Sequence, residues 1–201
     1  MGEQQGQQEE EETGTGGNTD IAHCQPPPVV FMMASMTIRD KLLSWESLPA
    51  WRAALRDRGG RLVMTNGCFD ILHVGHVTYL EAARNQGEAL LVGVNGDASV
   101  RALKGPGRPI NTEGDRAAVV AALASVDAVC IFQEKDVLKL LEHVRPEVYA
   151  KGGDYTLDTI HQPERRLVES MGGTVVVLGG VPGKSTSEVM VRMGKKPGDP
   201  E

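Results

Sequence analysis

Two histidines separated by three positions, His73 and His76, lie in the stretch of this chain with the clearest potential for chemistry. Each imidazole can donate a hydrogen bond to a phosphate oxygen, and each adds positive charge when it is protonated. An apolar run that ends at Met64 precedes them and an amphipathic run that begins near Val77 follows, which is the pattern of a strand, a turn and a helix start. If both histidines belong to the first helical turn, their rings project from one face. The stretch therefore predicts an anion site at the start of a helix.

Two glycines in the same stretch suit a turn that binds a ligand. Gly67 relieves the steric limits of the turn, and Gly75 lets a ligand approach the backbone closely. The first N–H groups of the following helix have no partner within the helix, so they face whatever is bound there. Nucleotidyl transfer requires an enzyme to position phosphates and to neutralise the charge that grows in the transition state. Two imidazoles at a helix start fit that need, and the alternative interpretation is a pair of capping or core histidines.

A second interpretation of this stretch makes the protein a metal-binding module without enzymatic activity. In that case the zinc ligands would be Cys68, Asp70, His73 and His76. Structural zinc sites normally combine paired Cys residues or Cys and His clusters. The sequence has no CxxC and no second cluster of this kind, which disfavours zinc. The sequence identifies no metal ligands beyond this alternative.

Three further segments carry groups suited to phosphates or hydroxyls. The loop 104–109 places Lys104 and a second cation among glycine and proline residues, which indicates either a positive loop that closes on a triphosphate or a solvated turn. In segment 151–155 two glycines precede Asp154, which binds sugar hydroxyls, ribose or an ion, or else closes a local turn. Segment 183–187 offers hydroxyls at a helix start, as an anion cradle or only as an N-cap.

These motifs resemble those of a known family. The pattern GxFDxxHxGH consists of Gly67, Phe69, Asp70, His73, Gly75 and His76. It resembles the signature of the nucleotidylyltransferases that include the cytidylyltransferases and several adenylyltransferases. With segments 94–100, 103–111 and 151–155 added, the match is similar to the heptose 1-phosphate adenylyltransferase domains of ADP-heptose synthases. The resemblance extends from about residue 42 to residue 193 and so covers the whole expected folded part.

The resemblance implies a reaction and its cofactors. AMP is transferred from ATP to D-glycero-β-D-manno-heptose 1-phosphate, which gives pyrophosphate and ADP-heptose, a precursor for lipopolysaccharide core or related glycans. The sugar phosphate oxygen is already an anion at neutral pH, so no covalent enzyme intermediate is needed. Mg²⁺ is implied by the triphosphate, because a divalent ion that bridges phosphate oxygens neutralises their charge. The alternative within the family is a cytidylyltransferase that acts on glycerol 3-phosphate or a similar alcohol phosphate.

The resemblance also assigns site residues by their positions in the motifs. The catalytic residues are His73, His76 and Lys104. The residues expected to bind the nucleotide are Asn66, Gly67, Cys68, Phe69, Gly75, Arg116, Gly183, Ser185, Thr186 and Ser187. The residues expected to bind the second substrate are Asp70, Asn95, Asp97, Lys151, Gly152 and Asp154. For Arg116 the alternative is an ordinary surface arginine.

Segment 183–187 departs from the family pattern at two positions. An acidic residue commonly precedes the glycine in heptose adenylyltransferases, whereas Pro182 stands there in this chain. Lys184 adds a cation within the segment. These changes bear on the detailed ligand contacts and leave the anion site itself in place.

Strand-like and helix-like segments alternate along the chain. The β-rich apolar runs are 61–65, 89–94, 128–132, 148–150 and 174–178. The segments with helical periodicity are 48–57, 77–85, 98–103, 113–124, 137–144 and 159–171, and a final helix begins at Ser185, which has capping-box spacing to Glu188. Such alternation predicts a Rossmann-like, doubly wound α/β domain whose five-stranded parallel sheet has helices on both faces. In this fold the ligand lies outside the carboxyl ends of the strands.

Composition separates a tail from one folded domain. Residues 1–35 hold six of the 27 acidic residues and no Lys or Arg, so the remainder has 21 acidic and 21 basic residues. This balance gives no support for nucleic-acid binding. The tail is rich in Gln, Glu, Gly and Pro and is expected to be disordered, either as an interaction tail or as a solvated extension. Residues 36–195 are expected to form a single nucleotidylyltransferase domain, and residues 196–201 a disordered C-terminus.

The sequence also indicates the cellular compartment and the partners of the protein. Three cysteines far apart in the chain suit a reducing compartment, and no apolar run approaches the length of a membrane span. The acidic start lacks the basic region of a signal peptide, so we expect a cytoplasmic protein. Many relatives of the resembled domain are fused to a ribokinase-like sugar kinase, for which this chain lacks room. A separate heptose kinase and a homodimer are therefore expected from the resemblance.

Overall fold

The computed structural model describes residues 37–153, 155–180, 183 and 185–194. By internal contacts the chain divides into two units, Met1–Ser35 and Met36–Glu201. The predicted disordered tail at 1–35 and the predicted disordered end at 196–201 lie outside the described residues, so both stay predictions.

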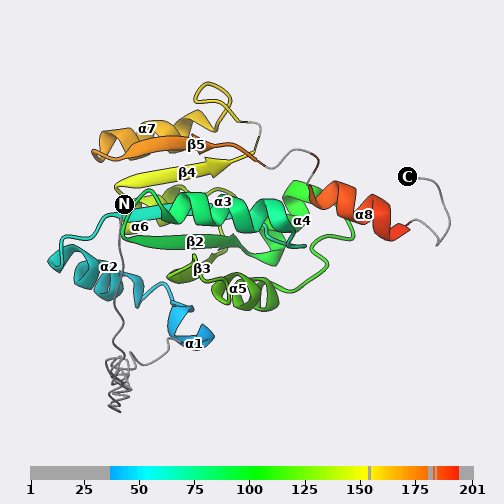
Figure 1. The fold of residues 1–201 in the computed structure, drawn as a ribbon, viewed down its shortest axis with the longest axis horizontal. Coiled ribbons are helices and arrows are strands. Elements are labelled where there is room, and N and C mark those ends of the chain that lie inside the picture. Colours follow the sequence, from blue (N-terminus) through cyan, green and yellow to red (C-terminus); the bar gives the residue numbers. More distant parts are fainter. Residues whose placement is uncertain (1–36, 154, 181–182, 184, 195–201) are drawn as a thin grey trace, which may run out of the picture. The chain divides into compact units, whose positions relative to one another are not determined.

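Five strands form one parallel sheet. They are β1 (Leu62–Gly67), β2 (Ala89–Asn95), β3 (Ala128–Phe132), β4 (Val148–Gly152) and β5 (Thr174–Leu178). Their order across the sheet is β3-β2-β1-β4-β5, and every neighbouring pair is parallel (Figure 1). The strand order reverses at β1, which makes the carboxyl end of β1 the switch point at which such folds bind ligands. The predicted Rossmann-like fold is confirmed.

Helices connect the strands and cover the sheet. They are α1 (Ile38–Lys41), α2 (Leu48–Asp57), α3 (Val74–Arg84), α4 (Asp97–Lys104), α5 (Glu113–Ala121), α6 (Leu138–Val144), α7 (Gln162–Ser170) and α8 (Thr186–Gly194). The sequence predicted all of them except α1. A capping box between Thr37 and Asp40 supports this single turn, and the turn buries no side chain, so no hydrophobic periodicity marks it. None of the described helices has the length and apolar character needed to cross a membrane.

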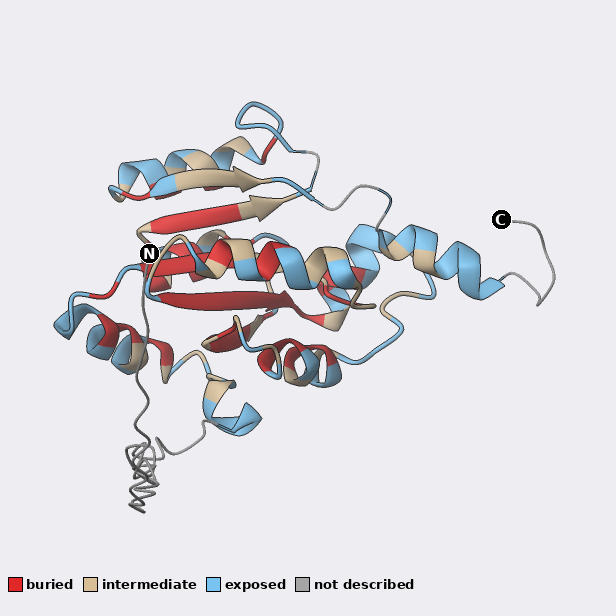
Figure 2. Cartoon of the chain, viewed as in Figure 1, coloured by how far each residue is buried: buried red, intermediate tan, exposed pale blue. Residues whose placement is uncertain are grey.

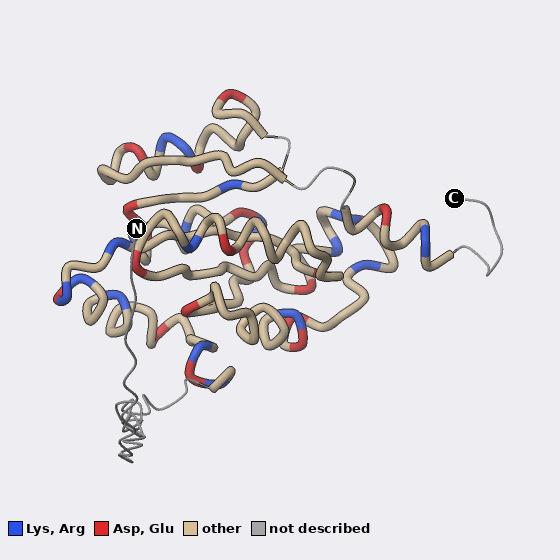
Figure 3. The backbone as a smooth tube through the Cα atoms, viewed as in Figure 1, with Lys and Arg blue, Asp and Glu red and all other residues tan. Residues whose placement is uncertain are grey.

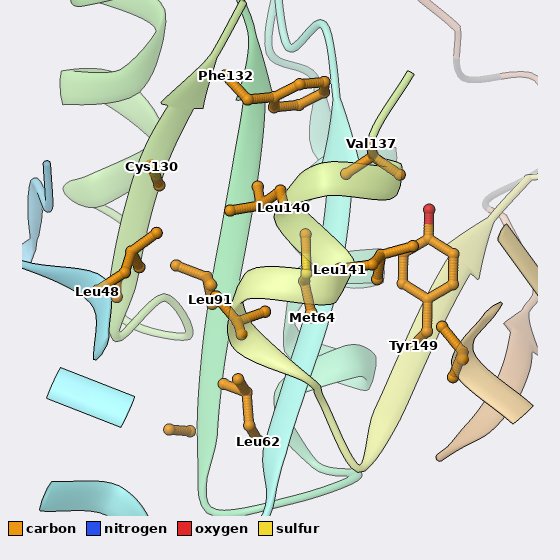
Figure 4. Packing of buried hydrophobic residues seen from close by; sticks show 14 of the residues in the cluster. Leu48, Leu62, Met64, Leu91, Cys130, Phe132, Val137, Leu140, Leu141 and Tyr149 are labelled. Atoms are coloured by element: carbon orange, nitrogen blue, oxygen red, sulfur yellow. The ribbon is translucent and has the colours of Figure 1, made fainter. Parts of the chain in front are cut away.

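Two hydrophobic clusters, one on each face, hold the sheet between its helices. Leu62 and Met64 of β1 join the cluster that contains α2 and α6 residues, whereas Val63 between them joins the cluster with α3 and α5 residues. Successive strand residues point to opposite faces, so a strand covered on both faces is apolar throughout. Figure 2 shows the central strands as almost entirely buried, and Figure 4 shows Leu140 of α6 near Leu91 of β2 and Leu141 beside Tyr149 of β4.

Charged residues surround this core without collecting by sign. Figure 3 shows acidic and basic residues interspersed along the described elements. This distribution agrees with the equal numbers of acidic and basic residues outside the tail.

Candidate functional site

A cleft of about 900 Å³ lies at the carboxyl ends of the central strands, where a doubly wound sheet is expected to bind its ligand. The predicted site residues that line it are Asn66, Gly67, Cys68, Phe69, Asp70, His73, Gly75, His76, Asn95, Lys104, Lys151, Gly152, Ser185, Thr186 and Ser187. Arg116, Asp97 and Gly183 do not line it. Asp154, Pro182 and Lys184 lie outside the described residues. The fold therefore brings most of the predicted residues to one place.

The turn after β1 has its unusual backbone at Phe69. This residue adopts a left-handed conformation with φ 46°, which costs a non-glycine residue free energy and is maintained only by its surroundings. Gly67 is needed for a different reason from the one predicted, because a Cβ at this position would lie 2.9 Å from Cε2 of Phe69. The Phe69 ring thus folds back over Gly67, and its centroid lies 5.3 Å from that of the His76 ring.

The two histidine rings stack at the start of α3. Their centroids are 3.9 Å apart and their planes differ by 29°. The sequence analysis considered the case in which both lie in the first helical turn. In the structure His73 is the N-cap with an extended backbone (φ −141°, ψ 169°), and only His76 lies within the helix. The His73 carbonyl accepts the hydrogen bond of the His76 N–H at 2.9 Å. The convergence of the rings therefore comes from a cap followed by a helical turn.

Both imidazoles are held neutral at physiological pH. Burial, with a smaller contribution from neighbouring His73, lowers the pKa of His76 to about 4. Burial also lowers the pKa of His73, although Glu188 opposes the shift. The Nδ1 atoms of both rings are buried and have no hydrogen-bond partner among the described residues. Both residues line the cleft, and a neutral imidazole can donate or accept a hydrogen bond there, so the rings are suited to contact a ligand.

Asp70 anchors a neighbouring loop with its carboxylate. It accepts hydrogen bonds from Nε of Arg108 at 2.5 Å and from the backbone N–H groups of Ile110 at 2.8 Å and Asn111 at 3.0 Å. Burial alone would raise the pKa of Asp70, but these hydrogen bonds together hold it below its ordinary value. The sequence analysis expected the Asp70 carboxylate oxygens to accept hydrogen bonds from the substrate. In the structure they accept hydrogen bonds from the loop that follows Lys104, which gives Asp70 a role in holding that loop.

Arg116 was expected to bind the nucleotide or to lie on the surface, and the structure shows it in neither position. It is only 1% exposed, so it is neither a surface arginine nor part of the cleft lining. Its guanidinium donates to the carbonyls of Cys68, Asn95 and Asn111 and to the carboxylate of Asp97. The interpretation as a nucleotide ligand is corrected in this respect, because the helical phase of α5 directs the side chain beneath the turn. Arg116 and Asp97 hold the ends of β1 and β2 together.

The start of α8 and the loop that begins at Lys104 also lie at the cleft. Ser185 and Glu188 form the predicted capping box, with both of its hydrogen bonds at 3.2 Å. The Thr186 hydroxyl donates to the Ile71 carbonyl at 3.4 Å, which ties the start of α8 to the β1 turn. Lys104 is the last residue of α4 and is exposed at the cleft. Figure 1 shows α8 on the side of the sheet toward which the strands point.

The cleft also contains residues that the sequence analysis did not assign to the site. They are Tyr79, Leu103, Arg108, Lys135, Asp136, Val137, Gly153, Tyr155, His161, Glu164 and Gly180. Glu164 is the most unusual of them, because it is a buried carboxylate in the first turn of α7. In the sequence it looks like an ordinary acidic residue near a helix N-terminus. Its polar neighbours in the chain provided no signal of burial.

The described residues contain no group of three or more His, Cys, Asp or Glu side chains arranged to hold a metal ion. The zinc interpretation requires the carboxylate of Asp70, which is hydrogen bonded to the 108–111 loop. The geometry of this turn therefore supports an anion site.

Comparison with known families identifies the fold of the site. Residues 64–189 match the model of the family described as cytidylyltransferase-like. The chain belongs to this family. The predicted resemblance to nucleotidylyltransferases is thereby confirmed, and the HxGH turn, the Lys104 loop and the start of α8 all lie within the matched residues.

Individual members of the family show how far the similarity extends. The protein named "Bifunctional protein HldE" from Methylobacillus flagellatus is 51% identical over 154 residues, which are 77% of this chain and 31% of that protein. Its counterpart from Mesorhizobium japonicum is 50% identical over 149 residues, or 74% of this chain and 30% of that protein. The chain thus spans about a third of the length of these curated relatives.

Two solved structures have similar folds. The lipopolysaccharide core biosynthesis protein from Thermoplasma volcanium is 31% identical, with a TM-score of 0.52, and the match covers 61% of this chain and 98% of that chain. Pantoate-beta-alanine ligase from Francisella tularensis, solved with an ATP ligand and beta-alanine, is 13% identical with a TM-score of 0.50. At that identity the ligase shares the fold alone.

Proposed function

We propose that this chain transfers AMP from ATP to D-glycero-β-D-manno-heptose 1-phosphate and releases pyrophosphate. The observation that carries the nucleotidyl transfer is the stacked pair of neutral imidazoles, with unpartnered buried nitrogens, at a helix start in the cleft. The assignment of heptose 1-phosphate as the acceptor rests on the motifs shared with heptose adenylyltransferases. Relatives about 50% identical are named bifunctional HldE, and a structural relative is named a lipopolysaccharide core biosynthesis protein, which fits a nucleotide-sugar product.

The reaction is an in-line substitution at the α-phosphorus of ATP. An oxygen of the sugar phosphate forms a bond to the α-phosphorus while the bond from that phosphorus to the oxygen bridging the α- and β-phosphates breaks. The bridging oxygen leaves with both electrons of that bond as part of pyrophosphate. Charge therefore grows on the phosphate oxygens, and hydrogen bonds aimed at those oxygens accelerate the step.

Residues of the cleft divide this task. We assign His73 and His76 to the α-phosphate, and the start of α8 with Ser185 and Thr186 to the β- and γ-phosphates, because helix N–H groups and hydroxyls bind anions. Lys104 contributes a mobile cation from the neighbouring loop. Mg²⁺ would accompany ATP and would neutralise part of the charge of its phosphates.

Three further expectations accompany this proposal. A kinase supplies the heptose 1-phosphate, because phosphorylated sugar is the acceptor. The protein is expected to act in the cytoplasm, where ATP is available, and as a homodimer. These expectations rest on the family resemblance.

The decisive experiment offers the protein each nucleoside triphosphate with Mg²⁺ and either heptose 1-phosphate or glycerol 3-phosphate, and follows pyrophosphate release. We expect release only with ATP and heptose 1-phosphate together, and we expect ADP-heptose as the product in equal amount. Release with CTP and glycerol 3-phosphate alone would overturn the proposal in favour of a cytidylyltransferase.

A further inference from the structure

A buried network of polar side chains forms the β4 side of the cleft. The Glu164 carboxylate of α7 accepts hydrogen bonds from the Lys151 ammonium and from the Tyr149 hydroxyl, both at 2.8 Å. Oδ1 of Asn66 lies 3.0 Å from the same ammonium and 2.6 Å from the same hydroxyl. Glu164 is 6% exposed and the Lys151 side chain is 15% exposed. The network is thus nearly closed to solvent, with Lys151 at its cleft surface.

Lys151 differs from the other cations of the cleft. Lys104 and Lys135 are exposed, so their long side chains are free to move, and Arg108 is already paired with Asp70. The ammonium of Lys151 is held at two points, whereas an ammonium has three N–H donors. One N–H donor therefore remains for a ligand in the cleft, and the protein fixes the position of the nitrogen that carries it.

A fixed cation has a particular use in this site. Both imidazoles are neutral at physiological pH, since burial lowers the pKa of His76 to about 4 and also lowers that of His73. Positive charge for a phosphate group must then come from other residues. Preorganised charges stabilise a transition state more than mobile ones do, because no reorganisation is required when the reaction occurs.

We propose that Glu164 is a positioning residue, which acts with Asn66 to hold the Lys151 ammonium so that its remaining N–H meets a phosphate oxygen of the reacting nucleotide. This inference rests on the proposed nucleotidyl transfer. Asn66 directly precedes Gly67 of the phosphate-binding turn, so the network joins Lys151 to the strand end that carries the turn. The Glu164 carboxylate is also the counter-charge of the Lys151 ammonium in this nearly closed network, which offsets part of the cost of removing the ammonium from water.

Tyr149 completes the network from the core. Burial, together with the negative charge of Glu164, raises the pKa of Tyr149 well above its ordinary value, so its hydroxyl keeps its proton and can donate. Its ring lies in the hydrophobic cluster beneath the sheet and 4.9 Å from the Lys151 nitrogen (Figure 4). The carboxylate is thereby oriented by a residue that is itself fixed by packing.

The chain offers a matched control at the opposite end of β4. There Glu147 pairs with Arg52, a residue that is 3% exposed, and also accepts a hydrogen bond from the backbone N–H of Leu62 at 2.7 Å. This ion pair links α2 to the start of β4 with one buried partner, since Glu147 is 39% exposed, and neither of its residues lines the cleft. Glu147→Gln therefore reports what the loss of such a pair does to the fold alone.

The kinetic test compares Glu164→Gln, Lys151→Ala, the double variant and Glu147→Gln with Mg²⁺, ATP and heptose 1-phosphate. We expect Glu164→Gln to lower kcat about 10- to 100-fold with a change in KM for ATP of less than about 3-fold. The double variant should be no slower than Lys151→Ala, because Glu164 acts through Lys151. Glu147→Gln should keep kcat. Normal kcat in folded Glu164→Gln, or multiplied losses in the double variant, would overturn the inference.

A second measurement does not depend on the sugar. We expect the ³¹P spectrum of a non-hydrolysable ATP analogue bound with Mg²⁺ to change in Lys151→Ala, and the Glu164→Gln spectrum to change in the same direction. A Glu164→Gln spectrum identical to wild type would contradict the inference even if heptose 1-phosphate proved not to be the acceptor. If Glu164→Gln does not fold, Tyr149→Phe removes one hydrogen bond to the carboxylate and should shift kcat and the spectrum in the same direction by less.

Discussion

Two kinds of buried polar group lie around the turn after β1, which Arg116 reaches from α5 and His76 from the first turn of α3. Asp70 and Arg116 have their charged groups bonded to backbone and side chains from three other segments. His73 and His76 keep buried Nδ1 atoms without a partner among the described residues. A buried polar atom left unpaired costs about 1–3 kcal/mol, so the satisfied pair builds the site and the unsatisfied pair is available for a ligand. The distinction separates residues whose loss should unfold the protein from residues whose loss should stop the reaction.

Arg116→Met should have the largest effect of these variants, and this effect should be a loss of stability. It leaves three carbonyls and the Asp97 carboxylate without their donor, which should lower the free energy of unfolding by about 3–5 kcal/mol. Urea denaturation measures this loss. Arg166→Met, at an exposed position of α7, is the control and should change stability by less than about 0.5 kcal/mol. A loss at position 116 as small as the control would show that the bonded residues are not structural.

His76→Ala should show the opposite pattern. We expect kcat to fall about 10²- to 10³-fold, or roughly 3–4 kcal/mol of transition-state stabilisation, while stability barely changes. His73→Ala should behave similarly, and the double variant should fall well short of the summed losses if both rings act on one phosphate group. Steady-state rates and thermal unfolding are measured on the same preparations. A folded His76→Ala protein with near-normal kcat would remove the histidine from the mechanism.

Asp70→Asn is a milder change to the hydrogen-bonded pair Asp70 and Arg116, because the Asn side chain keeps the shape of the Asp side chain but loses its charge. We expect about 1–3 kcal/mol less stability at pH 7. The hydrogen bonds that hold the pKa of Asp70 below its ordinary value stabilise the fold above the unfolded pKa of about 3.9, and this contribution is lost as the pH falls through the folded pKa. The difference from wild type should therefore shrink at pH 3. Asp158→Asn, at a fully solvated carboxylate, should show no such difference.

A further expected effect is a pH dependence of stability caused by His76. Its pKa is about 4 in the folded protein and about 6.5 when unfolded, so the unfolded state binds the proton first as the pH falls. Wild-type stability should therefore decrease between about pH 6.5 and pH 4, and His76→Ala should decrease less over the same range. Denaturation curves at several pH values measure the slope. Equal slopes for the two proteins would indicate that the ring is not buried as neutral imidazole.

Regular elements were predictable where periodicity was strong. The strands at 128–132 and 174–178 have the predicted bounds, because short β-rich apolar runs stand out in the sequence. Helix α3 begins at Val74, three residues before the predicted start at Val77, since His73 caps it without a capping side-chain hydrogen bond. The short α1 lacks a buried face, which explains why no pattern predicted it.

The features of the site likewise differ in whether the sequence could predict them. The sequence by itself determined the parallel sheet, the position of the cleft and the turn with His73 and His76, because these depend on local periodicity, chain order and a short motif. The tertiary structure decided that Arg116 is buried and that Glu164 holds Lys151. It also decided that the imidazoles are neutral. Burial and partners depend on segments that meet only in the fold, as Arg116 and Cys68 do across 48 positions, and no local pattern carries that information.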